Sequence, residues 1–254
     1  GSKKPAKHSL NEMEMQLLTQ IVNMLQDKQG YREQKFNASH YQLLDKLLAW
    51  PLETLPPVLD LIRVLCLHPA FAEYCSKDLN VIVKILKIGG NGLVNPVNGM
   101  LTCRIIINLF NRRITAKVLE EHYTEIINHL LYNMMCEDRK NTRLAFVRVL
   151  LHYSYAFYVL SYSKSNKSDV YKGEKLKCFA LLAEILYKEN DVDIILNILM
   201  AIGTLLFRDE NVIEFGNTMN IKMIFQSFQQ RYNNNQDIKA CCDELIRAID
   251  NPQL

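Results

Sequence analysis

The sequence predicts an all-α protein, an α-solenoid of about six armadillo-like repeats. Hydrophobic residues make up 49% of the 254 positions, and the scarcity of glycine (9) and proline (7) favours long helices joined by few turns. Three nearly apolar helical runs, at 58–67, 101–110 and 144–153, each contain one arginine. Consecutive arginines are 41 and 44 residues apart. These intervals match armadillo or HEAT units of ~40–47 residues, and they exceed the ~33–34 residues of ankyrin and tetratricopeptide units.

Capping signals and prolines predict the individual helices in order. Residues 9–12 (Ser-Leu-Asn-Glu) form a predicted capping box before an apolar stripe that continues to residue 29, and residues 39–42 form a second box. The second helix ends at Trp50, because the residue before a proline avoids the helical conformation. The remaining helices are expected at 58–67, 70–75, 78–88, 98–111, 116–120, 123–136, 141–158, 174–189, 191–207, 211–218, 221–232 and, after an Asp237 cap, 238–249.

Two irregular segments fit the same repeat scheme. The equivalent helix after Arg148 lies near Asn197, 49 residues further on, and a Ser/Lys-rich loop inserted at about 161–173 accounts for the longer interval. The glycine-rich stretch 89–92 is interpreted as a turn, because it lacks the Lys-Ser/Thr pair and the preceding strand of a phosphate-binding loop. The first helix and the helix at 238–249 are expected to cap the two ends of the array.

Composition narrows the possible classes further. Residues 1–8 are expected to be an expression tag and a disordered tail, which leaves 9–254 as a single domain. The seven cysteines show no C-x-x-C pair and no zinc-ligand spacing, so they are expected to be inert buried thiols in a reducing compartment, the cytoplasm and nucleus. No apolar run of the ~18 residues that span a bilayer is apparent, so no membrane contact is expected. No metal or cofactor is expected either.

The three arginines of the apolar runs, Arg63, Arg104 and Arg148, are the predicted partner-binding residues. Residues at equivalent positions of stacked repeats line the same concave face. A buried guanidinium is costly unless it is paired or meets a ligand, so three of them at one period predict a row of cations. The planar fork of arginine matches a carboxylate, including the one at a chain terminus.

Four further residues join the predicted contact set. Asn108 and His152, each four residues after an arginine, are candidates to bind the backbone amides of the ligand. Tyr153 and Tyr155 are candidates to flank an aromatic side chain of the ligand. A short tail that becomes ordered on binding is expected to bind with micromolar affinity.

A structural role is the alternative for most of these residues. Arg63 lies three residues after Asp60, the spacing of a helical ion pair, whereas no acid lies within four residues of Arg104. Asn108 also fits a core asparagine that binds backbone groups, and His152 fits a buried histidine with its hydrogen bonds satisfied. The tyrosines around Tyr153 fit half-buried packing residues.

Several short motifs carry a resemblance to a known family. In chain order they are Val-Leu-Asp-Leu-Ile-Arg at 58–63 followed by His68-Pro69, Leu-Thr-Cys-Arg at 101–104 with Asn108 and Phe110, His-Tyr-Ser at 152–154 with Phe157, Ala-Ile-Gly-Thr-Leu at 201–205, and Lys-Ala-Cys-Cys at 239–242. With these motifs the chain resembles the PUL domain, which is shared by the phospholipase-activating protein and its fungal relatives. The likeness runs from about residue 10 to the end.

The resemblance implies an armadillo-like fold and a defined partner. PUL domains lie at the C-terminus of proteins that also carry a WD-repeat propeller and a ubiquitin-binding middle domain. They bind the C-terminal tail of the hexameric AAA ATPase valosin-containing protein, through a basic concave groove that holds an acidic tail with an aromatic residue near its end. The parent protein would then be a cofactor of that ATPase in ubiquitin-dependent degradation, and ubiquitin would bind through other domains.

Carried over by position, Arg63 and Arg104 match arginines of the family motifs. Arg148 is predicted from the repeat period alone. Asn197 stands where the family is expected to have arginine, which would weaken tail binding or change the partner, and Arg148 could compensate from the neighbouring repeat.

An interaction module is therefore the first hypothesis, with no catalytic residues and with a monomeric state expected. A nucleic-acid-binding helical-repeat protein is the alternative, although the net charge of +3 is small and no base-reading polar triplets are found. An enzyme ranks third, because no Ser/His/Asp or Cys/His set can be placed together by spacing.

Overall fold

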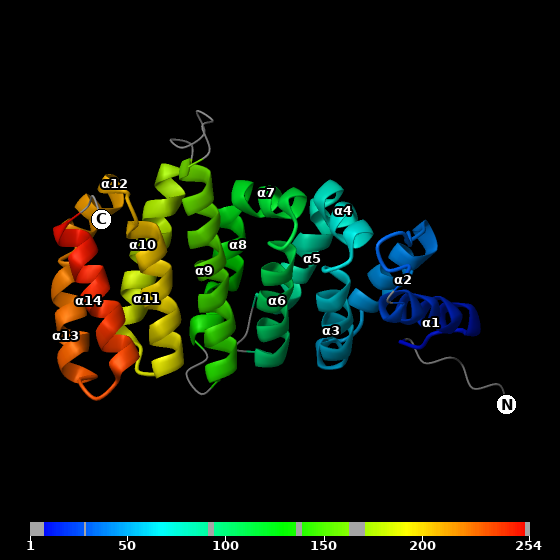
Figure 1. Cartoon of the computed structure of the whole chain (residues 1–254). Helices are drawn as coiled ribbons and strands as arrows, with labels where there is room; N and C mark the ends of the chain where they lie inside the picture. The colour runs from blue at the N-terminus through cyan, green and yellow to red at the C-terminus, as the bar shows by residue number, and fades with distance from the viewer. Residues whose placement is uncertain (1–7, 28, 91–93, 136–138, 163–170, 252–254) are drawn as a thin grey trace. The chain divides into compact units, whose positions relative to one another are not determined.

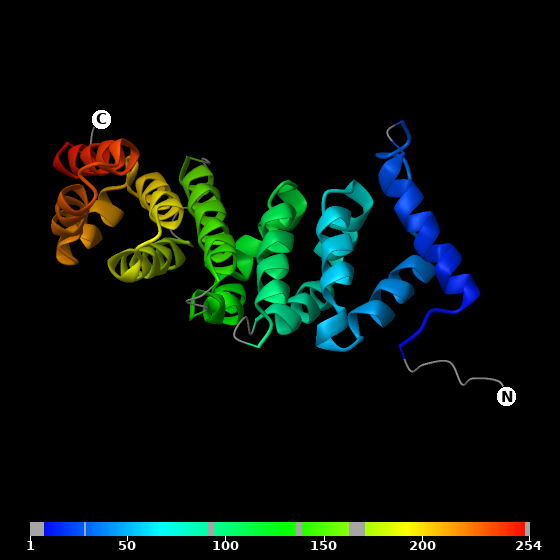
Figure 2. The same cartoon turned by 90° about the horizontal axis from the view of Figure 1, so that it is seen from below.

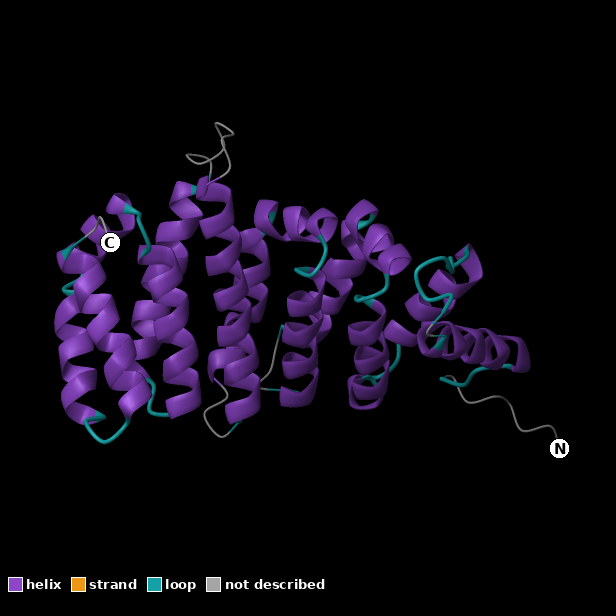
Figure 3. Cartoon of the chain, in the orientation of Figure 1, coloured by secondary structure: helices purple, strands orange, loops and turns teal. Residues whose placement is uncertain are grey.

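The computed structural model describes residues 8–27, 29–90, 94–135, 139–162 and 171–251. Within these ranges every regular element is a helix (Figure 3). Fourteen of these helices are α-helical and two are 3₁₀. The all-α class predicted from the scarcity of glycine and proline is confirmed, and so is the solenoid-like succession of helices.

The helices belong to two compact units, which are described separately. The first unit comprises residues 1–119 and 128–135, and the second comprises 120–127 and 136–254. The first unit contains α1 (Glu12–Gln26), α2 (Ala38–Leu48), η1 (Leu52–Thr54), α3 (Pro56–Leu65), α4 (Pro69–Lys77), α5 (Leu79–Gly89), α6 (Pro96–Leu109) and η2 (Leu131–Met135). The division between the units falls within α7 (Arg113–Glu121) and α8 (Tyr123–Leu130). The second unit contains α9 (Lys140–Tyr162), α10 (Lys172–Lys188), α11 (Val192–Leu206), α12 (Glu210–Thr218), α13 (Ile221–Arg231) and α14 (Gln236–Asp250).

The core of the first unit is built around α3 and α6, which lie side by side (Figure 1). The apolar faces of these two helices contribute fully buried side chains, namely Leu59, Ile62, Leu65, Ile105, Ile106 and Leu109. Side chains of α6 and the turn after it donate to backbone carbonyls near α3: Asn98 to Leu52 (2.9 Å), Asn108 to Arg63 (2.7 Å) and Arg112 to Leu67 (3.3 Å). These bonds join residues 45 or 46 positions apart, which defines the register of the two helices.

The core of the second unit is built around α9 and α11, with α10 packed against both and α14 against α11 (Figures 1 and 2). At one end of the pair, Lys140 at the start of α9 contacts Asp193 in the first turn of α11. At the other end, the rings of Tyr158 and Phe207 have centroids 5.8 Å apart. Because each contact joins corresponding ends of the two helices, α9 and α11 run parallel.

The first two helices begin at caps other than those predicted. The capping box of α1 uses Asn11, whose side chain accepts from the Glu14 N–H (2.9 Å) while Glu14 accepts from the Asn11 N–H (2.8 Å), instead of residues 9–12. The box of α2 uses Asn37 with His40, two residues before the predicted position. In both cases an asparagine oxygen is as good an acceptor as the serine hydroxyl that the prediction favoured.

Three further boundaries differ from the predictions. Asn235 caps α14, and Asp237 lies inside its first turn. The helix expected at 123–136 ends at Leu130 and is followed by the 3₁₀ helix η2. In contrast, α9 extends to Tyr162, so the predicted inserted loop is shorter than 161–173, and its residues 163–170 lie outside the described part. The predicted turn at 89–92 starts at the end of α5, and residues 91–93 are likewise outside the described part.

One described helix is long and apolar enough to cross a membrane, by length and composition alone. This stretch, Lys140–Ser161 of α9, was not expected, because charged residues interrupt its apolar runs. More than half of its most apolar window, 56%, is buried inside the protein. Core helices pass the same test, so the feature is weak evidence for a membrane and is explained by the position of α9 in the core of the second unit.

Candidate functional site

The three predicted arginines lie on the helices expected, but they are not buried. Arg104 on α6 and Arg148 on α9 are exposed, and the side chain of Arg63 on α3 is 32% exposed. The expectation of buried guanidinium groups was therefore wrong. Each helix turns one narrow stripe of side chains to solvent, and the arginine is part of that stripe, so its charge needs no buried partner.

Arg63 forms the ion pair that was weighed as its structural alternative. Its Nε donates to Oδ1 of Asp60 at 2.8 Å, one turn earlier on α3. This pair is at the surface, where water screens it strongly, so it contributes little to stability. It does neutralise much of the positive charge that Arg63 would offer to a ligand.

Arg104 is the most accessible cation on the α3–α6 pair. Its guanidinium makes no hydrogen bond or ion pair with any residue that the structure describes. The sequence of α6 contains no Asp or Glu, and the nearest acid of α3, Asp60, is already paired with Arg63. Arg104 is therefore available to bind an anion from solution.

Asn108 has the structural role that was considered as the alternative. Its side-chain amide donates to the Arg63 carbonyl at 2.7 Å, which fastens α6 to α3. The register of this bond also places Asn108, and not Arg104, level with Arg63. Arg104 lies one helical turn before that level on α6.

In the second unit, Arg148 on α9 is likewise exposed, and its guanidinium has no hydrogen-bond or ion-pair partner among the described residues. The ring Nδ1 of His152 lies 2.8 Å from the Arg148 carbonyl, which can only accept, so Nδ1 carries a proton in this contact. Asn197 on α11 donates to the Asp193 carbonyl of its own helix at 2.7 Å. Both polar side chains therefore satisfy backbone carbonyls one turn earlier.

Arg148 and Asn197 are neighbours across the parallel pair α9–α11. The contacts at the two ends of the pair join residues 53 and about 49 positions apart, Lys140 with Asp193 and Tyr158 with Phe207. Between these ends, Arg148 is level with the stretch of α11 from Asn197 to Met200. That Arg148 compensates for Asn197 stays a prediction.

Tyr153 does not lie on the surface, which corrects its place in the predicted contact set. Its side chain is fully buried, with Tyr123 in edge contact (4.9 Å between ring centroids) and Phe157 stacked (5.9 Å). This burial also raises the pKa of the Tyr153 phenol. Tyr155, which lies two positions on in the same helix, is 62% exposed.

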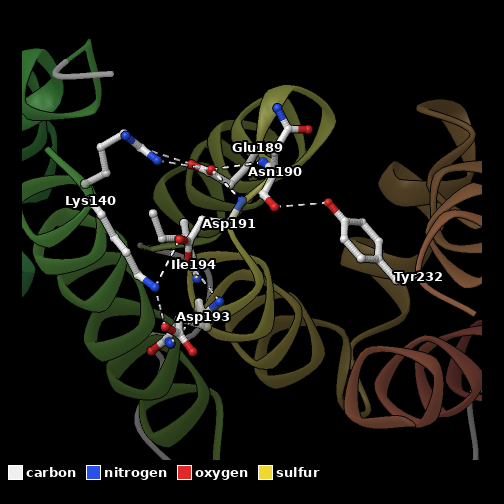
Figure 4. Close-up of polar contacts among 9 residues, drawn as sticks. Lys140, Glu189, Asn190, Asp191, Asp193, Ile194 and Tyr232 are labelled. Carbon is white, nitrogen blue, oxygen red and sulfur yellow. Dashed lines mark hydrogen bonds and ion pairs between the residues drawn. The ribbon is translucent and has the colours of Figure 1, made fainter. Parts of the chain in front are cut away.

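A polar network at the α10–α11 turn holds the start of α11 against α9 (Figure 4). Glu189 is buried and accepts from the backbone N–H groups of Asn190 (2.9 Å) and Asp191 (3.0 Å) and from the Arg143 guanidinium (3.3 Å). Lys140 binds the carboxylates of Asp193 and Asp191.

The charged partners at this turn shift the pKa values of Asp191 and Lys140. Burial alone would raise the pKa of Asp191, but its bonds from Lys140 and from the first N–H groups of α11 outweigh that effect, so its pKa lies below the usual value. Hydrogen bonds to Asp193 and then Asp191 raise the pKa of Lys140. The Tyr232 hydroxyl adds a bond to the Asn190 carbonyl (3.2 Å), which links the end of α13 to the same turn.

Comparison with known proteins assigns the family. A family model described as the PUL domain matches residues 1–244. The chain belongs to the PUL domain family. Among curated proteins, this PUL domain is 18% identical over 251 residues to phospholipase A-2-activating protein of Xenopus laevis, which covers 96% of this chain and 29% of that protein. It is 22% identical over 215 residues to the ubiquitin fusion degradation protein 3 homolog of Caenorhabditis elegans, covering 80% of this chain and 24% of that protein. The chain thus spans less than a third of either relative.

In the described ranges, no three His, Cys, Asp or Glu side chains gather in a way that could hold a metal ion. Six cysteines are described, all as free thiols, and all but Cys241 are buried. Burial raises the pKa of Cys178 and of Cys242 to about 12, so these thiols stay protonated and unreactive.

Sequence reasoning missed three surface residues of this PUL domain, namely Met200, Phe207 and Arg208 around the C-terminal half of α11. Met200 and Phe207 are exposed, and the Arg208 guanidinium lies over the Phe207 ring, 5.2 Å from its centroid. The available signal was their spacing, since residues seven apart share one face of a helix. Because nearly all residues of α11 are apolar, the exposed ones could not be told from the buried ones by residue type.

Proposed function

We propose that this PUL domain is a non-catalytic protein-interaction module that binds the C-terminal tail of the hexameric AAA ATPase valosin-containing protein. Family membership supports the interaction role in a protein of the ubiquitin pathway. One observation carries the site: Arg104 is exposed, has no partner among the described residues, and lies on a helix without a single acid.

Arginine suits an acidic tail better than lysine does. Its planar guanidinium can donate two parallel hydrogen bonds to one carboxylate, from a side chain or from the chain terminus. In this proposal there are two separate charged contacts, one made by Arg104 in the first unit and one made by Arg148 in the second. Arg63 contributes less, because Asp60 already accepts from it.

The polar residues near each cation have secondary parts in the proposal. His152 and Asn197 lie beside Arg148, and each already bonds a carbonyl of its own helix, so they add hydrogen-bonding capacity only at the edge of the site. Asn108 supports the site from beneath by fixing α6 to α3. Tyr155 is the aromatic contact, in place of the buried Tyr153.

The wider role is also proposed. The domain would act as part of a longer ubiquitin-binding cofactor of the ATPase, in which other domains bind ubiquitin. We propose that it acts as a monomer in the cytoplasm and nucleus.

Calorimetric titration with a synthetic peptide of the ATPase tail tests the proposal. We expect micromolar binding, because the flexible peptide loses conformational entropy when it becomes ordered. Amidation of the peptide C-terminus should weaken binding, since it removes one carboxylate. A folded domain that fails to bind the free-acid peptide would contradict the proposal. Tight binding to single-stranded RNA or DNA with a steep salt dependence would instead favour the nucleic-acid alternative.

A further inference from the structure

The first helix, α1, leaves an unusual share of its apolar side chains uncovered. It contains eight large apolar residues, but only Ile21 is buried. Met13 is 71% exposed, Met15 51% and Val22 36%. The helix lies at the outer edge of the first unit, where it packs mainly on α2 (Figure 1). Isolated exposed apolar residues are common on protein surfaces, but a contiguous group marks an interaction site.

The last helix, α14, has the outer surface that is normal for a terminal helix of a repeat array. Terminal repeats keep a polar outer surface, because solubility requires it. The exposed residues of α14 are polar or charged with the exception of Ala240, and they are Gln236, Asp237, Lys239, Asp243, Glu244, Arg247 and Asp250. The exposed side of α1 departs from this rule, so we expect a binding partner to cover it.

Four residues of α1 form one continuous apolar stripe, which we call the α1 face. Met15, Leu18, Val22 and Leu25 follow one another at intervals of three, four and three residues, so they share one flank of the helix. Helices pair in coiled coils through apolar residues with this spacing. Met15 and Val22 are exposed, whereas Leu18 and Leu25 are half-buried. The stripe therefore offers a second helix a surface of the form that helix pairing requires.

A hollow adjoins the α1 face at the C-terminal end of the helix. Its volume is about 420 Å³, within the range of ligand-binding pockets, and its walls include Leu25, Asp27, Tyr31, Arg32 and Glu33. Leu25 belongs both to the stripe and to the wall of the hollow. Because Leu25 and Tyr31 make part of the wall apolar, the hollow suits one large side chain of a helix that lies along the stripe.

The charges beside the α1 face favour a basic partner. The two charged residues of α1 are both acids. Glu14 is paired with Lys46 of α2, whereas the carboxylate of Glu12 has no partner among the described residues. The carboxylate of Glu33 at the hollow is also unpaired within the described ranges, beside the cation of Arg32. A partner with cations at both ends of its helix would therefore find one free acid at each end of the α1 face.

Other occupants fit this surface less well. A second copy of the chain would bring α1 against α1, and α1 has neither a cation to meet Glu12 nor an aromatic side chain to fill the hollow. Helices that lie on lipid surfaces carry Lys or Arg on their polar face, and α1 has none.

We propose that the α1 face and its hollow bind a basic amphipathic helix. The apolar side of that helix would pack along the stripe, one aromatic side chain would enter the hollow, and lysine or arginine residues would meet Glu12 and Glu33. This inference goes beyond the proposed function, because its ligand is basic and helical and none of its residues belongs to the proposed tail site.

The probe is an acetylated and amidated helical peptide with leucines and one phenylalanine on one side and lysines at both ends. It is titrated into the whole domain carrying ¹³C-methyl methionine. We expect the Met15 methyl signal, assigned with Met15→Leu, to shift in a saturable way. The signal of Met223, which is 67% exposed on α13, should stay in place. Peptides with serine in place of the apolar residues, or glutamate in place of the lysines, should bind more weakly.

Variants of the protein, titrated by calorimetry, complete the test. Met15→Ser and Val22→Ser should each weaken probe binding by about three- to tenfold, because they remove apolar contact area. Glu12→Gln should weaken it by about two- to threefold, and added salt should reduce this difference. Met223→Ser, which removes an exposed apolar side chain from α13, should have no effect. Because Met15 and Val22 are exposed, their variants should melt close to the wild type and bind the ATPase tail equally well.

Several results would overturn the inference. They are an unmoved Met15 signal at saturating peptide, equal shifts at Met15 and Met223, equal binding of the serine peptide, or unchanged binding by both Met15→Ser and Val22→Ser. A dimer in sedimentation that Val22→Ser dissolves would instead assign the α1 face to a second copy of the chain. Binding to phosphatidylserine vesicles that Val22→Ser abolishes would assign it to a lipid surface.

Discussion

Replacing Glu189 by glutamine should destabilise the second unit, because Glu189 joins the α10–α11 turn to Arg143 of α9. The carboxylate is only 7% exposed and accepts two backbone N–H bonds together with the Arg143 guanidinium. Glutamine has nearly the same size and keeps one oxygen to accept the N–H bonds. It removes the negative charge and presents a donor amide to Arg143.

The magnitude follows from what is lost. Hydrogen bonds between charged groups contribute more than neutral ones, and removing one partner of a buried pair leaves the other charge desolvated. We expect Glu189→Gln to lower the free energy of unfolding by about 2–3 kcal/mol. The matched control is Glu184→Gln, which removes an exposed pair with Lys188 on the same helix and should cost under about 0.5 kcal/mol.

Urea denaturation followed by far-ultraviolet circular dichroism measures both variants. Hydrogen exchange localises the effect, because the N–H groups of Asn190 and Asp191 should exchange faster in Glu189→Gln alone, since a neutral amide oxygen accepts their bonds more weakly than a carboxylate does. If both variants unfold at the same urea concentration, Glu189 contributes no more than a surface charge, and the interpretation of this turn as a buried clamp is refuted.

Three other substitutions test the packing and the titration of the first unit. Asn108→Ala should cost about 1–2 kcal/mol in urea denaturation, because it leaves the Arg63 carbonyl without its donor from α6; an unchanged midpoint would contradict this. Gly89→Ala should cost about 1–3 kcal/mol, because an added Cβ would lie 2.0 Å from the Thr102 hydroxyl oxygen, and a neutral effect would show that α5 and α6 can separate freely. The neutral Nδ1 of His68 accepts a hydrogen bond from the Ala70 N–H and so caps α4, and burial lowers the pKa of this histidine. The stability that the neutral ring contributes to the folded state is present above the unfolded pKa and is lost as the pH falls through the folded pKa. His68→Asn should therefore lose less stability than the wild type between about pH 7 and about pH 5, and parallel pH profiles would exclude His68 as the cause.

The sequence predicted the class of fold because that class depends on features visible in the chain. An interval of 41–44 residues between similar helices, together with few glycines and prolines, is sufficient for a helical repeat protein. Helix starts were predicted less well, since Ser9 and Asn11 are both good caps. The structure uses Asn11, and Glu14 of that capping box is also paired with Lys46 of α2.

The register between helices was not predictable from the spacing of the arginines. Arg63 and Arg104 are 41 residues apart, but the hydrogen bonds between α3 and α6 join residues 45 or 46 apart. The loop between two helices sets their relative level, and no local signal reports it. The two cations are consequently offset by one turn, with Asn108 at the level where a second arginine was expected.

Tyr153 and Tyr155 were both kept as candidate contacts, although helical spacing distinguishes the exposed one from the buried one. Tyr155 lies seven residues after Arg148 and shares its face, whereas Tyr153 lies five residues after it and points to the core. The same rule applied to α11 would have connected Met200 with Phe207. The left-handed backbone of Arg208, in contrast, depends on how α11 ends and has no signature in the sequence.

The most direct test of the central claim is a calorimetric comparison of two double variants with the wild type. Arg104→Ala/Arg148→Ala removes the two cations proposed to bind the ATPase tail, and Lys87→Ala/Lys177→Ala removes two exposed cations from α5 and α10 of the same units. We predict that the arginine variant loses tail binding by at least about tenfold while keeping its thermal melt, and that the lysine variant binds as the wild type does. Equal affinity of the arginine variant and the wild type, or an equal loss in both double variants, would contradict the account.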